Sequence, residues 1–237
     1  MLDIELTDMI SVLFVMLAVT VSILVTVKSL KSYRESKQAL TLIIAIASFL
    51  IALAMIFLTL EKAFLSILGI ENLGLLFGAT ATVISACAMV SFDLFAFKMA
   101  FTKRIAIYTA IASLVAAVYV IHWLIDPTKH VAAGEIQFLD PYGLGFQFTP
   151  FLSYLTMIPL ASLPIFILFY YAKKVRKESS IKSKRAALLG LGGVMLATAY
   201  IVELVGIEEV ITTGFRSLFV VSAFLFYYAL FKLKEKE

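Results

Sequence analysis

Seven long apolar runs, separated by charged or turn-rich breaks, constrain this chain more than any other feature of its sequence. They cover roughly residues 8–28, 39–60, 74–97, 105–125, 151–172, 186–207 and 214–232. Each run is close to the ~20 apolar residues that a helix needs to cross ~30 Å of hydrocarbon. Because a spanning segment must satisfy its own backbone polar groups, we expect all seven to be helices. The sequence therefore predicts an all-α membrane protein in which residues 1–237 form a single bundle of seven transmembrane helices.

The composition supports lipid as the solvent of most of the chain. Hydrophobic residues make up 62% of the 237 residues and charged residues only 15%. A soluble domain of this length has no interior large enough to hide that much apolar surface. We therefore expect the lipid bilayer as the main partner. One Asn and three Gln in the whole chain favour a thermophilic source, archaeal or bacterial.

The basic residues are sorted to one side of the predicted bundle. Residues 173–185, KKVRKESSIKSKR, hold seven lysines and arginines against one glutamate, and such a tract stays on the cytoplasmic side. Residues 28–38 add four basic residues, residues 98–104 three and the tail from residue 232 three, which places 17 of the 20 on that side. We expect a cell-membrane protein with its N-terminus outside and its C-terminus in the cytoplasm. Nucleic acid is not an expected partner, because the sorting by loop explains the positive charge.

The opposite side is acidic and carries the longest connection. Its acidic residues are Asp3, Glu5, Asp8, Glu61, Glu71, Asp126, Glu135, Asp140, Glu208 and Glu209. Within residues 134–150, GEIQFLDPYGLGFQFTP, apolar and polar residues alternate on both sides of a Pro/Gly turn. This pattern predicts a short β-hairpin over the outer mouth of the bundle. The alternative is an interfacial loop whose phenylalanines rest on lipid headgroups.

Small residues and prolines indicate how the helices pack. Gly78, Thr82 and Ala86 recur at four-residue spacing in the third run, and Gly190, Gly192 and Gly193 cluster in the sixth. Small residues let helix backbones approach closely in lipid, so we expect these two helices in the bundle interior. The fifth run contains Pro159 and Pro164, which should interrupt its hydrogen-bond ladder, bend it and free carbonyl groups in the outer half.

Charges inside a span are the default functional candidates, because each costs a few kcal/mol at the bilayer centre. Glu203 lies about one turn from the outer end of the sixth run and Arg216 at the outer start of the seventh. Similar depth on adjacent antiparallel helices predicts an ion pair. Such a pair either fixes helix packing only or takes part in ligand binding or proton sensing.

Four further residues are candidates for a ligand site or a switch. Asp93 lies near the inner end of the third run, where we expect it to pair with a basic residue of another inner loop or to act as a switch. His122 lies at the outer end of the fourth run, where a histidine is more often a residue of the aromatic belt than a ligand. Tyr119 and Tyr200 are polar groups at outer-half depth that could line a cavity with Glu203.

Motifs for catalysis and metal binding are missing from the sequence. The chain has two histidines and one cysteine, Cys87, and no HExxH pattern, so we expect neither a metal site nor a disulfide. The GxGD and GxSxG protease patterns are also missing, and the only lysines of the last run lie at its inner end, which excludes a retinal Schiff base at mid-membrane. We expect a protein that is not an enzyme and carries no cofactor.

A weak internal repeat supports a different class of protein. A shift of 147 residues places Ser36 on Ser183, Ala39 on Ala186 and Glu61 on Glu208. Runs one to three would then match runs five to seven, with run four as the linker. This organisation is typical of small-solute transporters built as two three-helix repeats. A third class is a subunit without catalytic activity in a larger membrane complex.

The arrangement resembles the seven-helix sensory region of some prokaryotic histidine kinases. The stretches that carry the resemblance are VKSLKSYRESKQALTLIIAIASFLIAL, GLGFQFTPFLSYL and KKVRKESSIKSKRAALLGLGGVML. The resemblance implies a receptor-like sensor that binds a small-molecule ligand, or senses a membrane property, in its outer half. Since the chain ends at Glu237 with no kinase domain, the output would be a separate cytoplasmic signalling protein. The bent fifth helix and the contact between Glu203 and Arg216 would be the bistable element.

Overall fold

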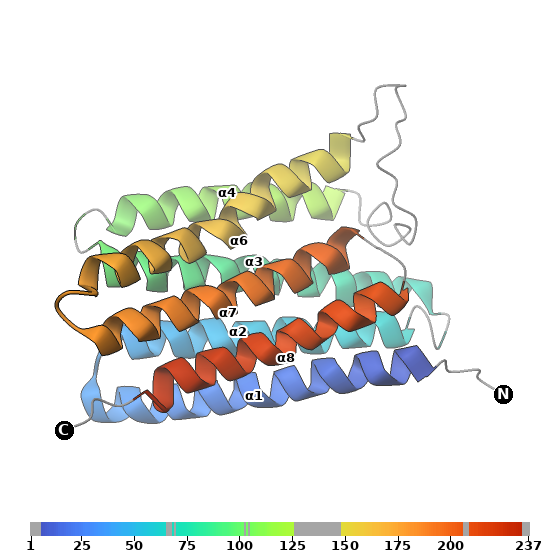
Figure 1. The fold of residues 1–237 in the computed structure, drawn as a ribbon. Coiled ribbons are helices and arrows are strands. Elements are labelled where there is room, and N and C mark those ends of the chain that lie inside the picture. The colour runs from blue at the N-terminus through green and yellow to red at the C-terminus, as the bar shows by residue number, and fades with distance from the viewer. Residues whose placement is uncertain are drawn as a thin grey trace.

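The computed structural model describes residues 6–64, 68, 70–101, 103, 105–125, 148–205 and 209–233. This part of the chain is helical and contains no strand. Its helices are α1 (Leu6–Ser36), α2 (Ala39–Lys62), α3 (Glu71–Ala100), α4 (Ile105–Ile125), α6 (Phe148–Val175), α7 (Ser180–Val205) and α8 (Glu209–Phe231), as Figure 1 shows. All except α4 contain a described stretch that is long and apolar enough to span a membrane, and α4 contributes the shorter stretch Ile105–Ile121. The prediction of an all-α, multi-pass membrane protein is confirmed.

The outer surface of the bundle is apolar along the length of the helices. Leu114, Phe166 and Phe224 leave 67%, 69% and 56% of their surface exposed. Soluble monomers rarely expose a continuous apolar surface of this kind. Lipid chains are the solvent that such side chains require, which explains why so little of the apolar composition is buried inside the protein.

Two basic segments that were expected as loops are largely helical. Helix α1 runs past Lys28 to Ser36, and Lys37 then ends it with a positive φ of 54° and an N–H donated to the carbonyl of Tyr33 over 2.8 Å. Lysine, arginine and serine are compatible with a helix that continues beyond the hydrocarbon into water. The predicted end at residue 28 was therefore too early.

Most of the basic tract of residues 173–185 is also helical, so the loop within it is shorter than expected. Helix α6 extends to Val175 and α7 begins at Ser180, which leaves residues 176–179 as a tight turn. Ser179 caps α7 by accepting a hydrogen bond from the backbone N–H of Lys182 over 3.2 Å. The hydroxyl of Ser183 donates to the carbonyl of Ala172 over 2.8 Å and so ties the start of α7 to the end of α6.

The predicted hairpin is wrong at its C-terminal end. Helix α6 begins at Phe148, which was expected to lie in the second strand. An apolar segment entering lipid satisfies its backbone groups within a helix, and this requirement overrides the short alternating pattern. The rest of the proposed hairpin, residues 134–147, lies outside the described residues.

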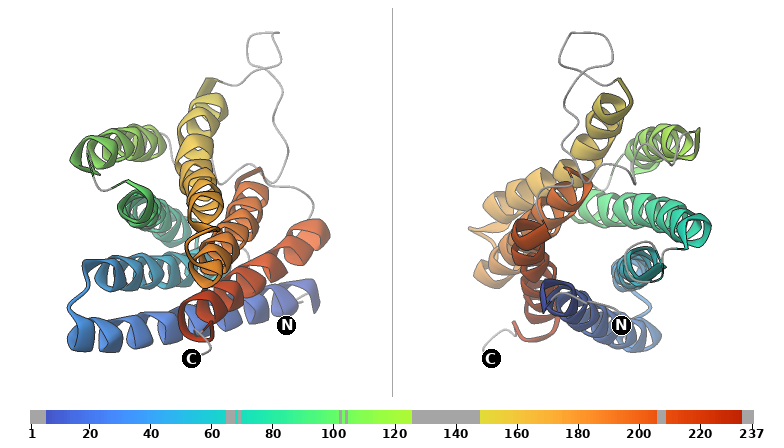
Figure 2. Two further views of the ribbon diagram at one scale, coloured as in Figure 1. Left: turned by 60° about the vertical axis from the view of Figure 1, so that its left-hand side comes forward. Right: turned by 90° about the vertical axis from the view of Figure 1, so that its right-hand side faces the viewer.

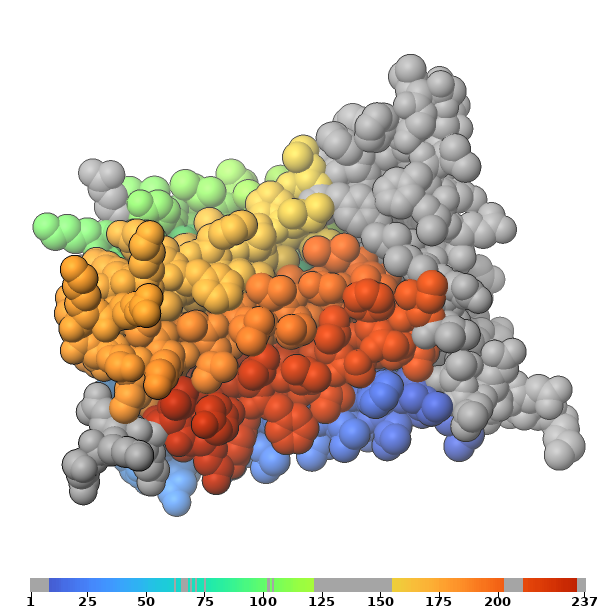
Figure 3. Space-filling model, in the orientation of Figure 1, coloured from blue at the N-terminus to red at the C-terminus, as the bar shows by residue number. Residues whose placement is uncertain are grey.

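Six helices form a closed ring and α4 lies on its outside. Helix α1 contacts α2, α2 contacts α3, α3 contacts α6, α6 contacts α7, α7 contacts α8, and α8 returns to α1. Helix α4 packs on α3 and α6 at the outside of the ring, as the two views of Figure 2 show. On the face drawn in Figure 3, the side chains of α6, α7, α8 and α1 form adjacent bands.

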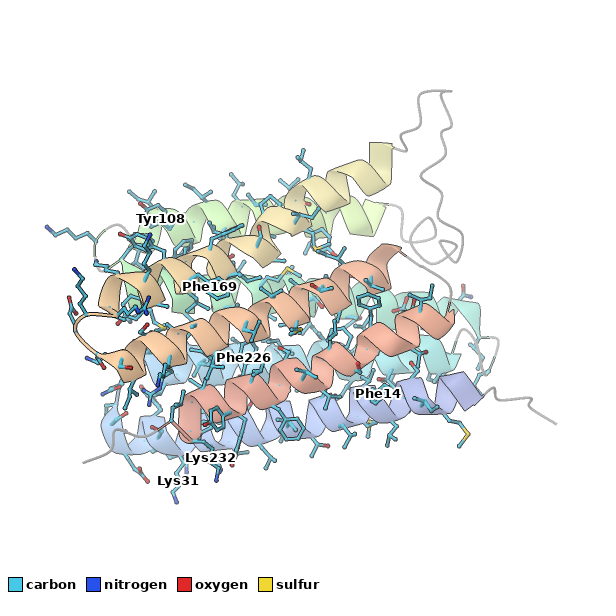
Figure 4. The ribbon with its side chains drawn as sticks, viewed as in Figure 1. Phe14, Lys31, Tyr108, Phe169, Phe226 and Lys232 are labelled. Carbon is cyan, nitrogen blue, oxygen red and sulfur yellow. The ribbon has the colours of Figure 1, made fainter. Side chains whose placement is uncertain are left out.

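Helix α7 packs through its glycines, as the small-residue pattern predicted. A Cβ at Gly192 would lie 2.8 Å from the ring of Phe226 on α8, and one at Gly193 would lie 3.0 Å from Ile165 on α6. Figure 4 labels Phe226 on α8 and Phe169 on α6; the ring of Phe169 lies against Gly190. Close backbone approach thus fixes α7 between its two neighbours.

The two ends of the bundle differ in charge. The C-terminal ends of α1, α3, α6 and α8 lie together at the end where the chain finishes, opposite the N-terminus (Figure 1). Lys31 of α1 and Lys232 after α8 lie at this end (Figure 4). The exposed basic residues at this end are Lys28, Lys31, Arg34, Lys37, Lys103, Lys173, Lys174, Arg176, Lys177, Lys182, Lys184 and Lys232. We call this end of the bundle the basic end.

Candidate ligand-binding site

A partly open cavity of about 70 Å³ lies among five helices of the ring. Residues of five helices line it: Ile51, Ala54, Met55 and Leu58 of α2, Ser85, Ala88, Met89 and Phe92 of α3, Leu160, Ala161 and Pro164 of α6, Gly193, Leu196, Ala197 and Tyr200 of α7, and Phe219 of α8. A cavity of this volume has room for several waters or for a small organic molecule. The cavity is the natural place for a small ligand.

The wall of the cavity is almost entirely apolar. Its side-chain polar groups are the hydroxyls of Ser85 and Tyr200. Mostly apolar walls with a few fixed polar groups are typical of small-molecule sites, where the apolar surface supplies affinity and the polar groups supply orientation. Tyr200, which was expected to line a cavity with Glu203, lies in this wall, whereas the side chain of Glu203 is outside the described part of the chain.

The hydroxyl of Tyr200 meets Tyr119 of α4. The two hydroxyl oxygens lie 3.1 Å apart, and Tyr119 is fully buried. Tyr119 thereby reaches from α4, outside the ring, to a residue of the cavity wall. A net hydrogen bond of this kind contributes about 1 kcal/mol and orients the phenol of Tyr200. The sequence proposed both tyrosines as candidates but did not predict that they contact each other.

Pro164 adds a backbone acceptor near the cavity. Helix α6 runs continuously through Pro159 and Pro164, and Pro164 is fully buried in the cavity wall. Because proline has no N–H, the carbonyl of Leu160, four residues earlier, lacks its usual helical donor. Leu160 also lines the cavity. The expected freed carbonyl therefore belongs to a residue of the cavity wall.

Arg216 is buried between α8 and α1 and does not line the cavity. Only 2% of its surface is exposed, and its guanidinium donates to the hydroxyl of Ser11. Glu203 lies in α7 and His122 in α4, but their side chains are outside the described part of the chain. The ion pair between Glu203 and Arg216 stays a prediction, as does the role of His122.

Asp93 does not form the ion pair expected for it. Its side chain is fully buried in α3, and neither carboxylate oxygen accepts a hydrogen bond from any residue that the structure describes. Within the described residues, the expected ion pair is therefore not formed: most described lysines and arginines near the C-terminal end of α3 are exposed, whereas Asp93 lies seven residues before that end, at Ala100.

Sequence reasoning missed two groups of residues. The first is the contribution of α2 to the cavity, whose apolar residues carry no signal that separates cavity wall from lipid face. The second is a set of buried hydroxyls, Ser22, Ser48 and Ser222, in the wall of a smaller pocket that shares four residues with the cavity. The spacing of Ser22, Thr26 and Ser29 at i, i+4 and i+7 marks one polar face of α1 and could have revealed it.

The basic end is fastened by two of its own side chains. Arg185 of α7 donates to the carbonyls of Ala229 over 3.0 Å and Leu233 over 2.7 Å, which caps the C-terminal end of α8. Lys28 of α1 donates to the hydroxyl of Tyr227, and its ammonium lies 4.6 Å from the centre of that ring. These contacts join α1, α7 and α8 at the basic end.

The described residues contain no group of three or more His, Cys, Asp or Glu side chains that could hold a metal ion. Chemically, the cavity can enclose a small and largely apolar molecule and offer it a few hydrogen bonds. Comparison of the chain with protein family models, with curated proteins and with solved structures finds no match.

Proposed function

We propose that this protein is a receptor-like membrane sensor that binds a small, largely apolar molecule in the cavity of its helix ring. The observation that carries the proposal is the cavity itself, which lies among α2, α3, α6, α7 and α8. Ser85, Tyr200 and the carbonyl of Leu160 are the groups available to a single polar function of the ligand. An apolar body with one hydroxyl is the ligand chemistry that suits this wall.

The sensor requires a route from the cavity to a partner. Helices α6 and α7 both line the cavity, and they meet at the turn of residues 176–179 at the basic end. The bond between Ser183 and Ala172 fastens that turn to both helices. A ligand that prefers one arrangement of α6 against α7 would therefore change the geometry of the basic end.

The proposed orientation places the basic end in the cytoplasm and the N-terminus outside, with α4 as a seventh crossing. The exposed lysines and arginines of the basic end support it, because such clusters are retained inside. They would also suit an acidic surface on a separate signalling protein. In intact cells, an impermeant maleimide should leave Lys103→Cys and Lys177→Cys unmodified and should label Lys129→Cys, all in a Cys87→Ala background. Labelling of Lys103→Cys would contradict the orientation, and protection of Lys129→Cys would contradict the crossing of α4.

Ligand binding is tested with phenol as the probe, and benzene as the probe without a hydroxyl. Phenol at about ten times its dissociation constant should stabilise the folded protein by about 1.4 kcal/mol. This raises the unfolding temperature by about 3–5 °C for a chain of this size. Tyr200→Phe should weaken phenol binding several-fold and leave benzene binding unchanged.

A pair of matched variants separates cavity binding from partition into lipid. Ala88 is buried in the cavity wall, whereas Ala117 is exposed on α4. Ala88→Leu fills the cavity and should abolish the phenol effect, and Ala117→Leu should retain it. An equal response of both variants would show that phenol acts through the membrane or detergent, and the proposed site would be wrong.

A small-solute transporter is the second candidate, favoured by the helix arrangement. Helices α1 to α3 and α6 to α8 make up the ring, with α4 outside, as expected for two three-helix repeats and a linker. The apolar wall speaks against a sugar or amino-acid substrate. A transporter opens its site to both sides in turn, so an impermeant thiol reagent should reach Ser85→Cys, in a Cys87→Ala background, from either side of the membrane. Protection from the basic end favours the sensor.

A further inference from the structure

Asp93 has an environment that differs from that of every other described charge in this protein. Of the buried side chains in the described residues, two carry a formal charge, Asp93 and Arg216. Arg216 donates to Ser11, whereas both oxygens of Asp93 lack a hydrogen-bond partner within the described residues. A carboxylate that is taken out of water and left unpaired costs several kcal/mol. Its retention in an apolar span therefore calls for a functional explanation.

The position of Asp93 links the cavity to the basic end. Met89, Asp93 and Phe97 follow one another at four-residue spacing along one side of α3. Met89 lines the cavity, and the ring of Phe97 stacks on Tyr108 of α4 at 5.2 Å between centres. Asp93 thus lies one helical turn beyond Met89 and directly after Phe92, which also lines the cavity. It is seven residues, or about 10 Å of helix, from the end of α3 at Ala100.

A second unsatisfied polar atom belongs to the helix that packs here. The hydroxyl oxygen of Thr109, next to Tyr108 in α4, is buried and has no hydrogen-bond partner among the described residues. Because α3 and α4 run antiparallel and meet at Phe97 and Tyr108, Thr109 lies on the part of α4 that packs along this stretch of α3. Asp93 and Thr109 are thus two polar side chains at similar depth on helices that pack together, and their buried oxygens make no hydrogen bond within the described residues.

The surrounding elements offer Asp93 no described counter-charge. Helix α2 has no titratable side chain from Ala39 to Leu60. The titratable residues on the parts of α4 and α6 that pack near α3 are Tyr108, Tyr119, Tyr170, Tyr171, Lys173 and Lys174, and those on α3 besides Asp93 are Glu71, Cys87 and Lys98. None of them donates a hydrogen bond to Asp93. The two α6 lysines are exposed at the basic end.

We propose that Asp93 is a proton-binding site that exchanges its proton with water at the basic end. Uptake converts the carboxylate and one proton, delivered by water, into a neutral carboxylic acid, and release returns the proton to the same side. The neutral form is compatible with the close packing of α3 on α4 and α6, which we call the seam. The charged form requires water or a donor such as Thr109, and so favours an arrangement in which the seam opens. Protonation thereby couples the position of α3, which also lines the cavity, to pH at the basic end.

The proposal does not depend on the nature of the cavity ligand. The test is infrared difference spectroscopy of the full chain in lipid nanodiscs, recorded while the pH is raised from neutral. We expect the carbonyl band of a protonated carboxylic acid at neutral pH, its reversible loss at alkaline pH and its shift in D₂O. Asp93→Asn should lack the band, Asp93→Glu should retain it at a shifted frequency, and Glu61→Gln, which alters the half-buried carboxylate at the opposite end, should leave it unchanged.

Three results would overturn the proposal. The first is a wild-type spectrum that matches that of folded Asp93→Asn, since Asp93 would then be ionised at neutral pH. The second is a band that neither titrates nor shifts in D₂O before the protein unfolds, which would show a proton that does not exchange. The third is loss of the band on adding sodium at constant pH, which would make a metal cation the ligand of the carboxylate.

Discussion

Among the described side chains of this bundle, two charged ones are buried, and their surroundings are opposite. Arg216, between α8 and α1, donates to Ser11 and lies on the side of the ring where Lys28 contacts Tyr227 and Arg185 caps α8. Asp93, on the α3 side facing α4 and α6, has no hydrogen bond within the described residues. A satisfied buried charge fixes one arrangement of helices, whereas an unsatisfied one favours a change of state. We therefore distinguish a fastened side, formed by α1, α7 and α8, from a movable side, formed by α3, α4 and α6, on which the proposed proton-binding site lies.

The largest expected effect is on the fastened side. Arg216→Ala removes the hydrogen bond to Ser11 and leaves a cavity between α8 and α1, so we expect the free energy of unfolding to fall by about 3 kcal/mol. Unfolding in mixed detergent micelles measures it. Lys31→Ala, an exposed residue of the basic end, is the control and should change stability by less than about 0.5 kcal/mol. Equal effects of the two substitutions would mean that Arg216 does not fasten this side.

A glycine pair tests how tightly the fastened side is packed. A Cβ at Gly192 would lie 2.8 Å from the ring of Phe226, whereas no atom lies within 4 Å of a Cβ at Gly214. We expect Gly192→Ala to lower stability by about 2 kcal/mol through overpacking. Gly214→Ala should raise it by up to about 1 kcal/mol through helix propensity. A stabilising Gly192→Ala would show that α7 and α8 separate easily.

Removing the buried charge of the movable side should raise the free energy of unfolding, whereas removing Arg216 lowers it. Asp93→Val replaces an unsatisfied carboxyl group with an apolar one, so we expect stability at neutral pH to rise by about 1–2 kcal/mol. The same unfolding assay gives the value, and the infrared band of the carboxylic acid should disappear in this variant. A loss of stability would indicate that Asp93 makes favourable contacts that fix α3.

The smallest expected effect concerns the contact between α4 and the cavity wall. In a double-mutant cycle, Tyr119→Phe and Tyr200→Phe should show a coupling energy of about 1 kcal/mol, because their hydroxyls lie 3.1 Å apart. Strictly additive effects would show that the two hydroxyls do not interact in the membrane. This result would also remove the described link between α4 and α7.

Much of the fold could be predicted from apolar runs, and much of the site could not. Run length and charge sorting predicted all seven helices and the basic end, because the bilayer imposes simple length and charge rules. Helix ends were placed too early where Lys28 and Lys173 follow an apolar run, since helices continue in water when their residues permit it. The small-residue pattern correctly placed α7 among close neighbours. Tyr200, singled out as a polar group in an apolar run, lies in the cavity wall.

The hydrogen-bond partners of individual polar residues could not be predicted from the sequence. Asp93 and Arg216 are both single charges in apolar helices. The sequence around them does not indicate that Arg216 has a hydrogen-bond partner and that Asp93 has none within the described residues. The same holds for Ser11 and Tyr119, whose contacts join helices far apart in the chain. Which polar groups meet depends on the rotation of each helix, and apolar runs that face both protein and lipid do not specify it.

The proposal that ligand binding changes the basic end is tested most directly by the distance between α1 and the turn of residues 176–179. Spin labels at Lys177→Cys, in the turn between α6 and α7, and at Lys31→Cys on α1, in a Cys87→Ala background, allow pulsed electron paramagnetic resonance to measure it with and without phenol. We predict that phenol shifts the distance distribution, and that Ala88→Leu abolishes the shift while Ala117→Leu preserves it. An unchanged distribution, in protein whose unfolding temperature phenol still raises, would show that the cavity binds a ligand without signalling and would contradict the account.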